Sequence, residues 1–196
     1  MLHAITNSRF IAGALVAGSL LMATPAFAAD DILEAIDSAR KSYQAGDLPN
    51  AKQSLDLASQ LIAQKNAEAF SGLLPEPLSG WKAEKAQATA VGAAMFGGAS
   101  AATRSYTNAK GDTVEISITG DSAMIMQLGP ILSNPGMAGA MGKLIRVGNQ
   151  RAIQTNDGDV MMLVANKVLV QVQGSADAGA KLDYAKAVDV GKLSKM

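Results

Sequence analysis

The residues best suited to chemistry in this chain are serines and lysines, because its 196 residues include no cysteine and one histidine, His3. Ser38 and Lys41, and again Ser79 and Lys82, have the S-x-x-K spacing in which a lysine can activate a serine nucleophile. The companion S-D-N and K-T-G motifs are absent. Chance spacing therefore explains both pairs better than catalysis does.

The chain has no cysteine at all and no histidine after His3, and this excludes several kinds of site. Thiol nucleophiles, histidine general bases, Ser-His-Asp triads, disulfides and zinc sites built from these residues are all excluded. The segment from Gly98 to Ala102 has the beginning of a nucleophile elbow but lacks its final glycine. No catalytic residue is therefore predicted, and an enzyme here would depend on carboxylates, serine or lysine alone.

Methionine is the one residue type that suggests metal binding. The chain has ten methionines, and in an exported protein thioether sulfurs suit Cu(I). Met137 and Met141, in the small-residue segment NPGMAGAMG, are the candidate ligands. The alternative is that methionines fill gaps in a core poor in aromatic residues, with Met161 and Met162 on opposite faces of a strand. This packing alternative is favoured, so no metal or cofactor is predicted.

Charged residues suggest two further surface features. The carboxylates of Asp157-Gly158-Asp159 are suitable calcium ligands, but their spacing fits a turn between strands better than a twelve-residue calcium loop. Lys143, Arg146 and Arg151, together with Arg104, predict a small basic patch at one sheet edge. A charged edge that resists aggregation would have the same composition.

The N-terminus has the pattern of a secretory signal peptide. Arg9 precedes an apolar stretch from Phe10 to Met22, and Ala26-Phe27-Ala28 has the A-x-A form of a cleavage site. The apolar stretch is shorter than the roughly 20 residues needed to span a bilayer. We therefore expect residues 1–28 to be a signal peptide cleaved after Ala28. The mature protein would then be periplasmic or secreted, without membrane insertion.

Composition also bears on the kind of partner. The 17 basic and 17 acidic residues balance, so the chain lacks the positive charge that attracts the nucleic-acid backbone. An aromatic content of 4% leaves little material for stacking on bases. We expect no nucleic-acid partner, which leaves another protein or a second copy of this chain.

Hydrophobic periodicity divides the mature chain into a helical pair and a sheet domain. Residues 29–69 hold two amphipathic helices separated by Gly46, the second extending to about Lys65. Residues 70–81 contain two prolines and are expected to be a linker. Residues 82–196 form the second domain.

The second domain alternates apolar and polar residues with the period of half-buried strands. Strands are predicted at Gln87–Val91, Ala101–Thr107, Thr113–Thr119, Leu144–Val147, Arg151–Thr155, Val160–Ala165 and Lys167–Gln173. One helix is expected after Asp121-Ser122 and another after Asp177. The predicted fold class is therefore α+β, an N-terminal helical hairpin followed by an antiparallel β-sheet domain with two covering helices.

The hairpin resembles a single tetratricopeptide repeat over about residues 31–65. The matching positions are Gly46-Asp47, Ala51, Leu55 and Ala58. The family's aromatic residue near the start of the first helix is Ala35 here, and the pattern does not recur downstream. Since such repeats need about three copies to bury a continuous core, one copy does not predict a solenoid. The resemblance implies a surface that binds protein.

These observations favour a non-enzymatic, exported binding or accessory protein that acts through protein–protein contact. Tyr43, Leu55 and Ile62, from the apolar stripes of the hairpin, are the candidate partner-binding residues. The first alternative is a carrier of a small ligand or of Cu(I) that uses the methionines or an apolar cleft between sheet and helix. The second alternative is an enzyme that uses only carboxylates, serine or lysine.

Overall fold

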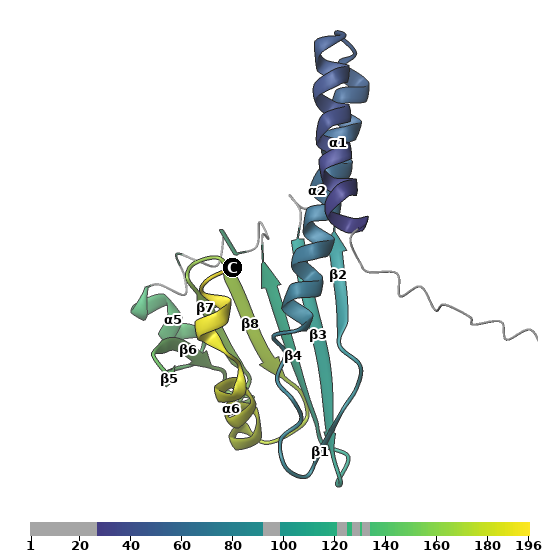
Figure 1. Ribbon diagram of the computed structural model, residues 1–196. Coiled ribbons are helices and arrows are strands. Elements are labelled where there is room, and N and C mark those ends of the chain that lie inside the picture. Colours follow the sequence, from purple (N-terminus) through teal and green to yellow (C-terminus); the bar gives the residue numbers. More distant parts are fainter. Residues whose placement is uncertain (1–26, 92–98, 121–124, 127–129, 131–133) are drawn as a thin grey trace, which may run out of the picture.

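The computed structural model describes residues 27–91, 99–120, 125–126, 130 and 134–196. A pair of N-terminal helices is followed by an antiparallel sheet and C-terminal helices, so the predicted α+β class is confirmed. Figure 1 shows the helical pair standing at one end of the sheet, with part of its length beyond the strands.

The helical pair consists of α1 (Phe27–Gln44) and α2 (Leu48–Ser71). Gly46 makes the turn between them at φ +78°, a conformation that glycine adopts without steric cost. Asp47 then caps α2 by accepting a hydrogen bond from the Asn50 backbone N–H at 3.2 Å. The hairpin is as expected, but α2 continues about six residues beyond Lys65, where its last turns reach the sheet.

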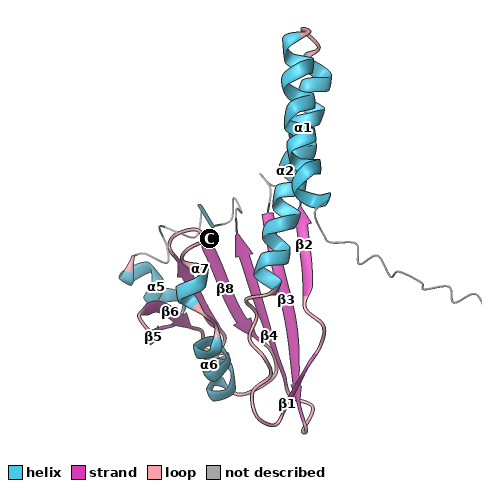
Figure 2. Cartoon of the chain, viewed as in Figure 1, coloured by secondary structure: helices cyan, strands magenta, loops and turns pink. Residues whose placement is uncertain are grey.

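The sheet contains eight antiparallel strands, in the order β1-β3-β4-β8-β7-β6-β5, with β2 also paired to β3. The strands are β1 (Trp81–Ala83), β2 (Gln87–Val91), β3 (Ala99–Asn108), β4 (Thr113–Gly120), β5 (Lys143–Val147), β6 (Gln150–Gln154), β7 (Val160–Val164) and β8 (Val168–Gln173). All seven predicted strands are present, and β1 is additional. Figure 2 shows the strands as one continuous layer.

One face of the sheet carries the main core. Alternate residues of the central strands are fully buried there, such as Ile116, Val170 and Met162. Three helical segments cover this face: the C-terminal turns of α2, α6 (Ala178–Ala187) and α7 (Val190–Leu193). A smaller cluster, formed by strand residues that point away from this face, joins Leu163 and Leu169 to Ile125.

Residues 70–81, expected to be a linker, belong to this core. Phe70 and Leu74 are 3% and 5% exposed. A Cβ added to Gly120 would lie 2.6 Å from the Phe70 ring, so the ring rests directly on the strand backbone. The Tyr106 hydroxyl donates a hydrogen bond to the Pro75 carbonyl at 2.7 Å. The prolines shape a segment that packs against the sheet, so no flexible connection separates hairpin and sheet.

Aromatic rings extend this attachment. The Tyr106 and Tyr184 rings have centroids 4.4 Å apart, and Trp81 meets Tyr184 edge-on at 5.3 Å. The Leu78 backbone N–H donates to the Tyr184 hydroxyl at 3.3 Å. Burial raises the pKa of both Tyr106 and Tyr184 above the usual tyrosine value. This cluster is structural, because its polar groups bond to the backbone of residues 75–78.

The helix expected after Asp121-Ser122 falls mostly outside the described residues. The helix expected after Asp177 is α6, and Asp177 caps it by accepting from the Ala180 backbone N–H at 2.8 Å. A further short helix, α5 (Pro135–Met141), precedes β5 and is capped by Asn134. No helix in the described part of the chain is long and apolar enough to cross a membrane.

Candidate functional site

The two helices of the hairpin meet through small side chains. Ala35 and Ala39 of α1 and Ala51 and Ala58 of α2 are 4–5% exposed. Among these alanines, the Ser54 hydroxyl donates a hydrogen bond to the Ser38 hydroxyl at 3.2 Å. Because alanine fills the contact between the helices, the larger apolar residues of the same stripes lie outside it.

Six of those large apolar residues are 43–70% exposed. They are Leu33, Ile36 and Tyr43 on α1 and Leu48, Leu55 and Ile62 on α2. Within each helix their spacings of three, seven or fourteen residues place them in one row. We call the two rows together the apolar face.

Helix geometry puts both rows on the same side of the hairpin. In an ideal helix, the direction of the exposed row differs from that of the contact alanines by roughly 90° in α1 and roughly 50° in α2. The rotation has the same sense in both helices when each is followed from its N-terminus to its C-terminus. In an antiparallel pair, rotation in the same sense moves both rows to one side. Counted from Gly46, Tyr43 lies level with Leu48, and Ile36 lies level with Leu55. The apolar face is therefore about 20 Å long.

The remaining surface of the hairpin is mainly polar. Asn50, Gln53, Gln60 and Gln64 are exposed on the other side of α2, where Leu57 is the one large apolar residue. Ion pairs Arg40–Asp37 at 3.0 Å and Lys52–Asp56 at 2.6 Å connect exposed side chains along each helix. All the large exposed apolar residues of the hairpin except Leu57 are thus gathered on one side.

The predicted partner-binding residues all belong to the apolar face. Tyr43 is 70%, Leu55 56% and Ile62 45% exposed. The other three residues of the apolar face, Leu33, Ile36 and Leu48, are not among the predicted ones. The spacing of Ala35, Ala39, Ala51 and Ala58 is the signal that would have identified the contact between the helices and, by exclusion, the exposed rows.

None of the residues considered for catalysis lies in a catalytic arrangement. Ser38 bonds to Ser54, and Ser79 and Lys82 are both exposed. Ser100 is completely buried in β3, and its hydroxyl has no hydrogen-bond partner among the described residues. A nucleophile must meet substrate, so burial makes Ser100 unsuitable for this role.

Asp157-Gly158-Asp159 forms the turn between β6 and β7, as expected. Gly158 has φ +81°, and the Lys181 ammonium lies 2.8 Å from the Asp157 carbonyl and 2.7 Å from the Asp159 carboxylate. Lys181 is 2% exposed, so its buried charge occupies the position that a cation would take. Within the described residues, no group of three or more acidic or histidine side chains is arranged to hold a metal ion.

The methionines are distributed between core and surface. Met162 is buried in the main core, whereas Met161 lies on the opposite face, which confirms the alternation expected for a strand. Met137 and Met141 lie four residues apart on α5, and Met137 is half-exposed. Four-residue spacing places both thioethers on one side of this short helix.

The basic residues expected at one sheet edge do not all come together. Arg146 of β5 and Arg151 of β6 are directly opposite each other in the strand register. Lys143 lies on the other face of β5 from Arg146, because strand residues alternate. Arg104 is on β3, separated from β6 by three strands, and donates hydrogen bonds to the Glu84 and Pro75 carbonyls. Arg104 therefore does not belong to the patch.

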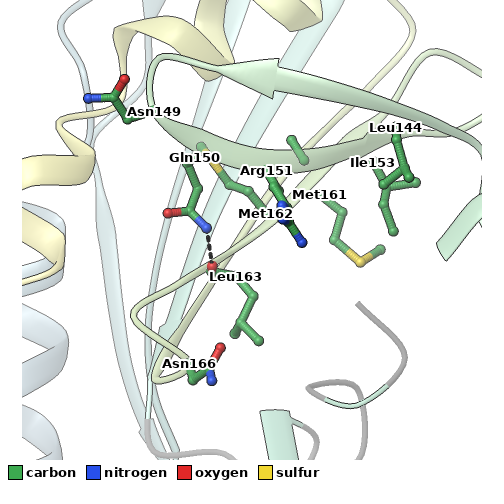
Figure 3. A pocket seen from close by; sticks show the side chains of 10 residues that line it. Leu144, Asn149, Gln150, Arg151, Ile153, Met161, Met162, Leu163 and Asn166 are labelled. Atoms are coloured by element: carbon green, nitrogen blue, oxygen red, sulfur yellow. Dashed lines mark hydrogen bonds between the residues drawn. The ribbon is translucent and has the colours of Figure 1, made fainter. Parts of the chain in front are cut away.

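A hollow of about 340 Å³ opens beside Arg151 on the sheet face opposite the main core. Figure 3 shows Arg151, Ile153 and Met161 on neighbouring strands, with Asn166 at the turn between β7 and β8. The Gln150 side-chain amide donates a hydrogen bond to the Leu163 carbonyl at 2.6 Å, which fixes one wall. The hollow combines an apolar floor with one guanidinium.

Comparison with protein-family models, with curated proteins and with solved structures finds no match to this chain.

Proposed function

We propose that the mature chain is an exported, non-enzymatic binding or accessory protein whose apolar face docks onto another protein. The main support is that six large apolar side chains are exposed in two rows, while alanines fill the contact between the helices. Exposed apolar surface gathered on one side is typical of a protein interaction site. The resemblance of the hairpin to a tetratricopeptide repeat supports the same class of function.

The energetics favour a partner that covers both rows. Completing the burial of a half-exposed leucine or isoleucine contributes about 1 kcal/mol, so the six residues supply about 6 kcal/mol. Association itself costs from about 4 to 15 kcal/mol. Tight binding therefore requires a partner that contacts the whole face and adds contacts of its own. An amphipathic helix laid between the two rows meets this requirement.

Export is proposed from the sequence pattern alone. An apolar stretch followed by Ala26-Phe27-Ala28 supports signal cleavage after Ala28. Mass spectrometry of protein recovered from the medium or periplasm should give a mature N-terminus at Ala29 or Asp30. Exported protein that still carries Met1 would contradict this part of the proposal.

The binding proposal is tested by crosslinking in cells. A photo-crosslinking amino acid placed at Tyr43 should capture a partner, whereas the same group at Gln53, on the polar side of α2, should not. Leu55→Asp should abolish capture, and Gln53→Asp should leave it unchanged. Analytical ultracentrifugation of the purified protein shows whether the captured partner is a second copy. Equal capture from both positions, or capture that survives Leu55→Asp, would refute binding through the apolar face.

A further inference from the structure

Two arginines face each other across the hairpin of β5 and β6. Arg146 and Arg151 are directly opposed in the register, and both are exposed. The ion pairs found between described residues involve other side chains, so neither arginine is neutralised by them. Like charges in directly opposite positions destabilise a strand pair. A bound anion would reverse that effect.

The hollow beside Arg151 has the composition of a small amphiphile site. Its floor includes the apolar side chains of Leu144, Ile153 and Met161, which share one face of three neighbouring strands. Its rim carries Asn166, whose amide can donate a hydrogen bond. The volume of about 340 Å³ lies near the lower end of the range for ligand pockets, which suits a compact molecule.

The turn that carries Asn166 is strained. Ala165 and Asn166 have φ +50° and +56°, in the left-handed region. Asparagine tolerates this conformation, but alanine does so at a steric cost that glycine would avoid. Two successive positive φ values are what a tight turn between antiparallel strands requires, and the Lys167 N–H closes this one by donating to the Val164 carbonyl at 3.0 Å. The turn places Asn166 at the rim of the hollow.

We propose that this hollow binds a small carboxylate with an apolar body. The planar guanidinium of Arg151 binds the carboxylate through paired hydrogen bonds, and Arg146 adds long-range attraction. The hydrocarbon part lies on Leu144, Ile153 and Met161. This activity goes beyond the proposed function, because it uses the opposite end of the sheet from the hairpin and none of its residues.

The test uses the full mature chain, labelled at its methionine methyl groups, with sodium octanoate as the probe in NMR titrations. The Met161 methyl resonance, assigned with Met161→Leu, should shift saturably, and that of Met196 should not. Arg151→Gln should weaken binding at least about tenfold, since it removes charge-assisted hydrogen bonds. Lys110→Gln, at the exposed turn between β3 and β4, should leave it unchanged. Octanol, with the same chain and no charge, should bind at least tenfold more weakly than octanoate.

Several outcomes would overturn the proposal. They are the absence of a saturable Met161 shift, equal binding of octanol and octanoate, and unchanged affinity in Arg151→Gln. Tighter binding of octyl phosphate than of octanoate would overturn the assignment to carboxylates. Arg151 is exposed, so its substitution should leave the fold intact, and unshifted resonances of the methionines that do not line the hollow verify this in the free variant.

Discussion

Phe70→Ala should destabilise the whole protein, although Phe70 lies on the hairpin helix α2. The ring is 3% exposed, belongs to the main core and rests on the Gly120 backbone at the end of β4. Truncating a buried phenylalanine removes its transfer free energy and leaves a cavity, which together cost about 3–5 kcal/mol. Urea denaturation followed by circular dichroism should show a lower midpoint, with one cooperative transition and a similar slope.

The matched control is Leu55→Ala on the same helix. Leu55 lies about four turns earlier and is 56% exposed, so its truncation should change the free energy of unfolding by less than about 1 kcal/mol. The contrast between the two variants locates the boundary between core and exposed arm within α2. A small effect of Phe70→Ala would show that hairpin and sheet are independent. An effect of Leu55→Ala as large as that of Phe70→Ala would show that the apolar face is buried.

The other predictions concern the buried pair, the tyrosines and the strained turn. Asp159→Ala should cost about 3–5 kcal/mol in urea denaturation, because it leaves a buried ammonium without its counter-charge, while Lys181→Met should cost less, because water reaches the partly exposed carboxylate. The raised pKa values of Tyr106 and Tyr184 mean that the folded state holds its phenolic protons more tightly than the unfolded state. Their contribution to the free energy of unfolding is therefore complete below about pH 10 and is lost as the pH rises above it, at up to about 1.4 kcal/mol per pH unit for each residue. Tyr106→Phe should reduce the slope of this free energy against pH between about pH 10 and 11, and an unchanged slope would contradict the assignment. Ala165→Gly should raise the free energy of unfolding by up to about 1 kcal/mol, measured by thermal denaturation, and a loss of stability would show that the turn is unstrained.

The sheet was largely predictable because β4 alternates strictly between buried and less buried residues and the other strands are short apolar runs bounded by turn residues. Val114, Ile116 and Ile118 occupy the core face of β4, and the residues between them occupy the other face. Strand β1 escaped prediction because three residues are too few to display a period. Its place is set by pairing with β3, where Trp81 lies opposite Asn108, a long-range contact that local sequence does not specify.

The end of the hairpin was harder to predict than its beginning. Gly46 and Asp47 mark the turn through local backbone chemistry, which a sequence displays directly. The prolines at 75 and 77 favoured a linker, since proline usually interrupts regular structure. In the folded protein the Pro75 carbonyl accepts from Tyr106 and Arg104, two residues of a strand about 30 positions away. Tertiary contacts thus turned an irregular segment into part of the core.

The hollow depends on register, which composition does not display. The turn at Gly148 sets Arg146 opposite Arg151, and the next pairing sets Ile153 opposite Met161. In the structure Val147 pairs with Gln150 across a two-residue turn, and turn length fixes which residues are opposed. The predicted second strand begins only at Arg151, which leaves three residues for the turn and does not specify this register. The predicted basic patch contains Arg146 and Arg151 but also Lys143 and Arg104, because local sequence does not specify strand order or the face that each residue occupies.

The use of alanine rather than larger residues at the contact between α1 and α2 follows from how each helix is stabilised along its length. The last turns of α2 are fixed on the sheet by Phe70, so they nucleate the helix, and each further residue extends it at little cost. The exposed part then needs α1 only as a support, and a contact through Ala35, Ala39, Ala51 and Ala58 provides this while burying little apolar surface. A hairpin that existed only to stabilise the fold would gain more by turning Leu55 and Ile36 into that contact. Because these side chains lie outside the contact, the isolated chain does not gain the free energy of burying them. A partner that covers the apolar face would supply that burial.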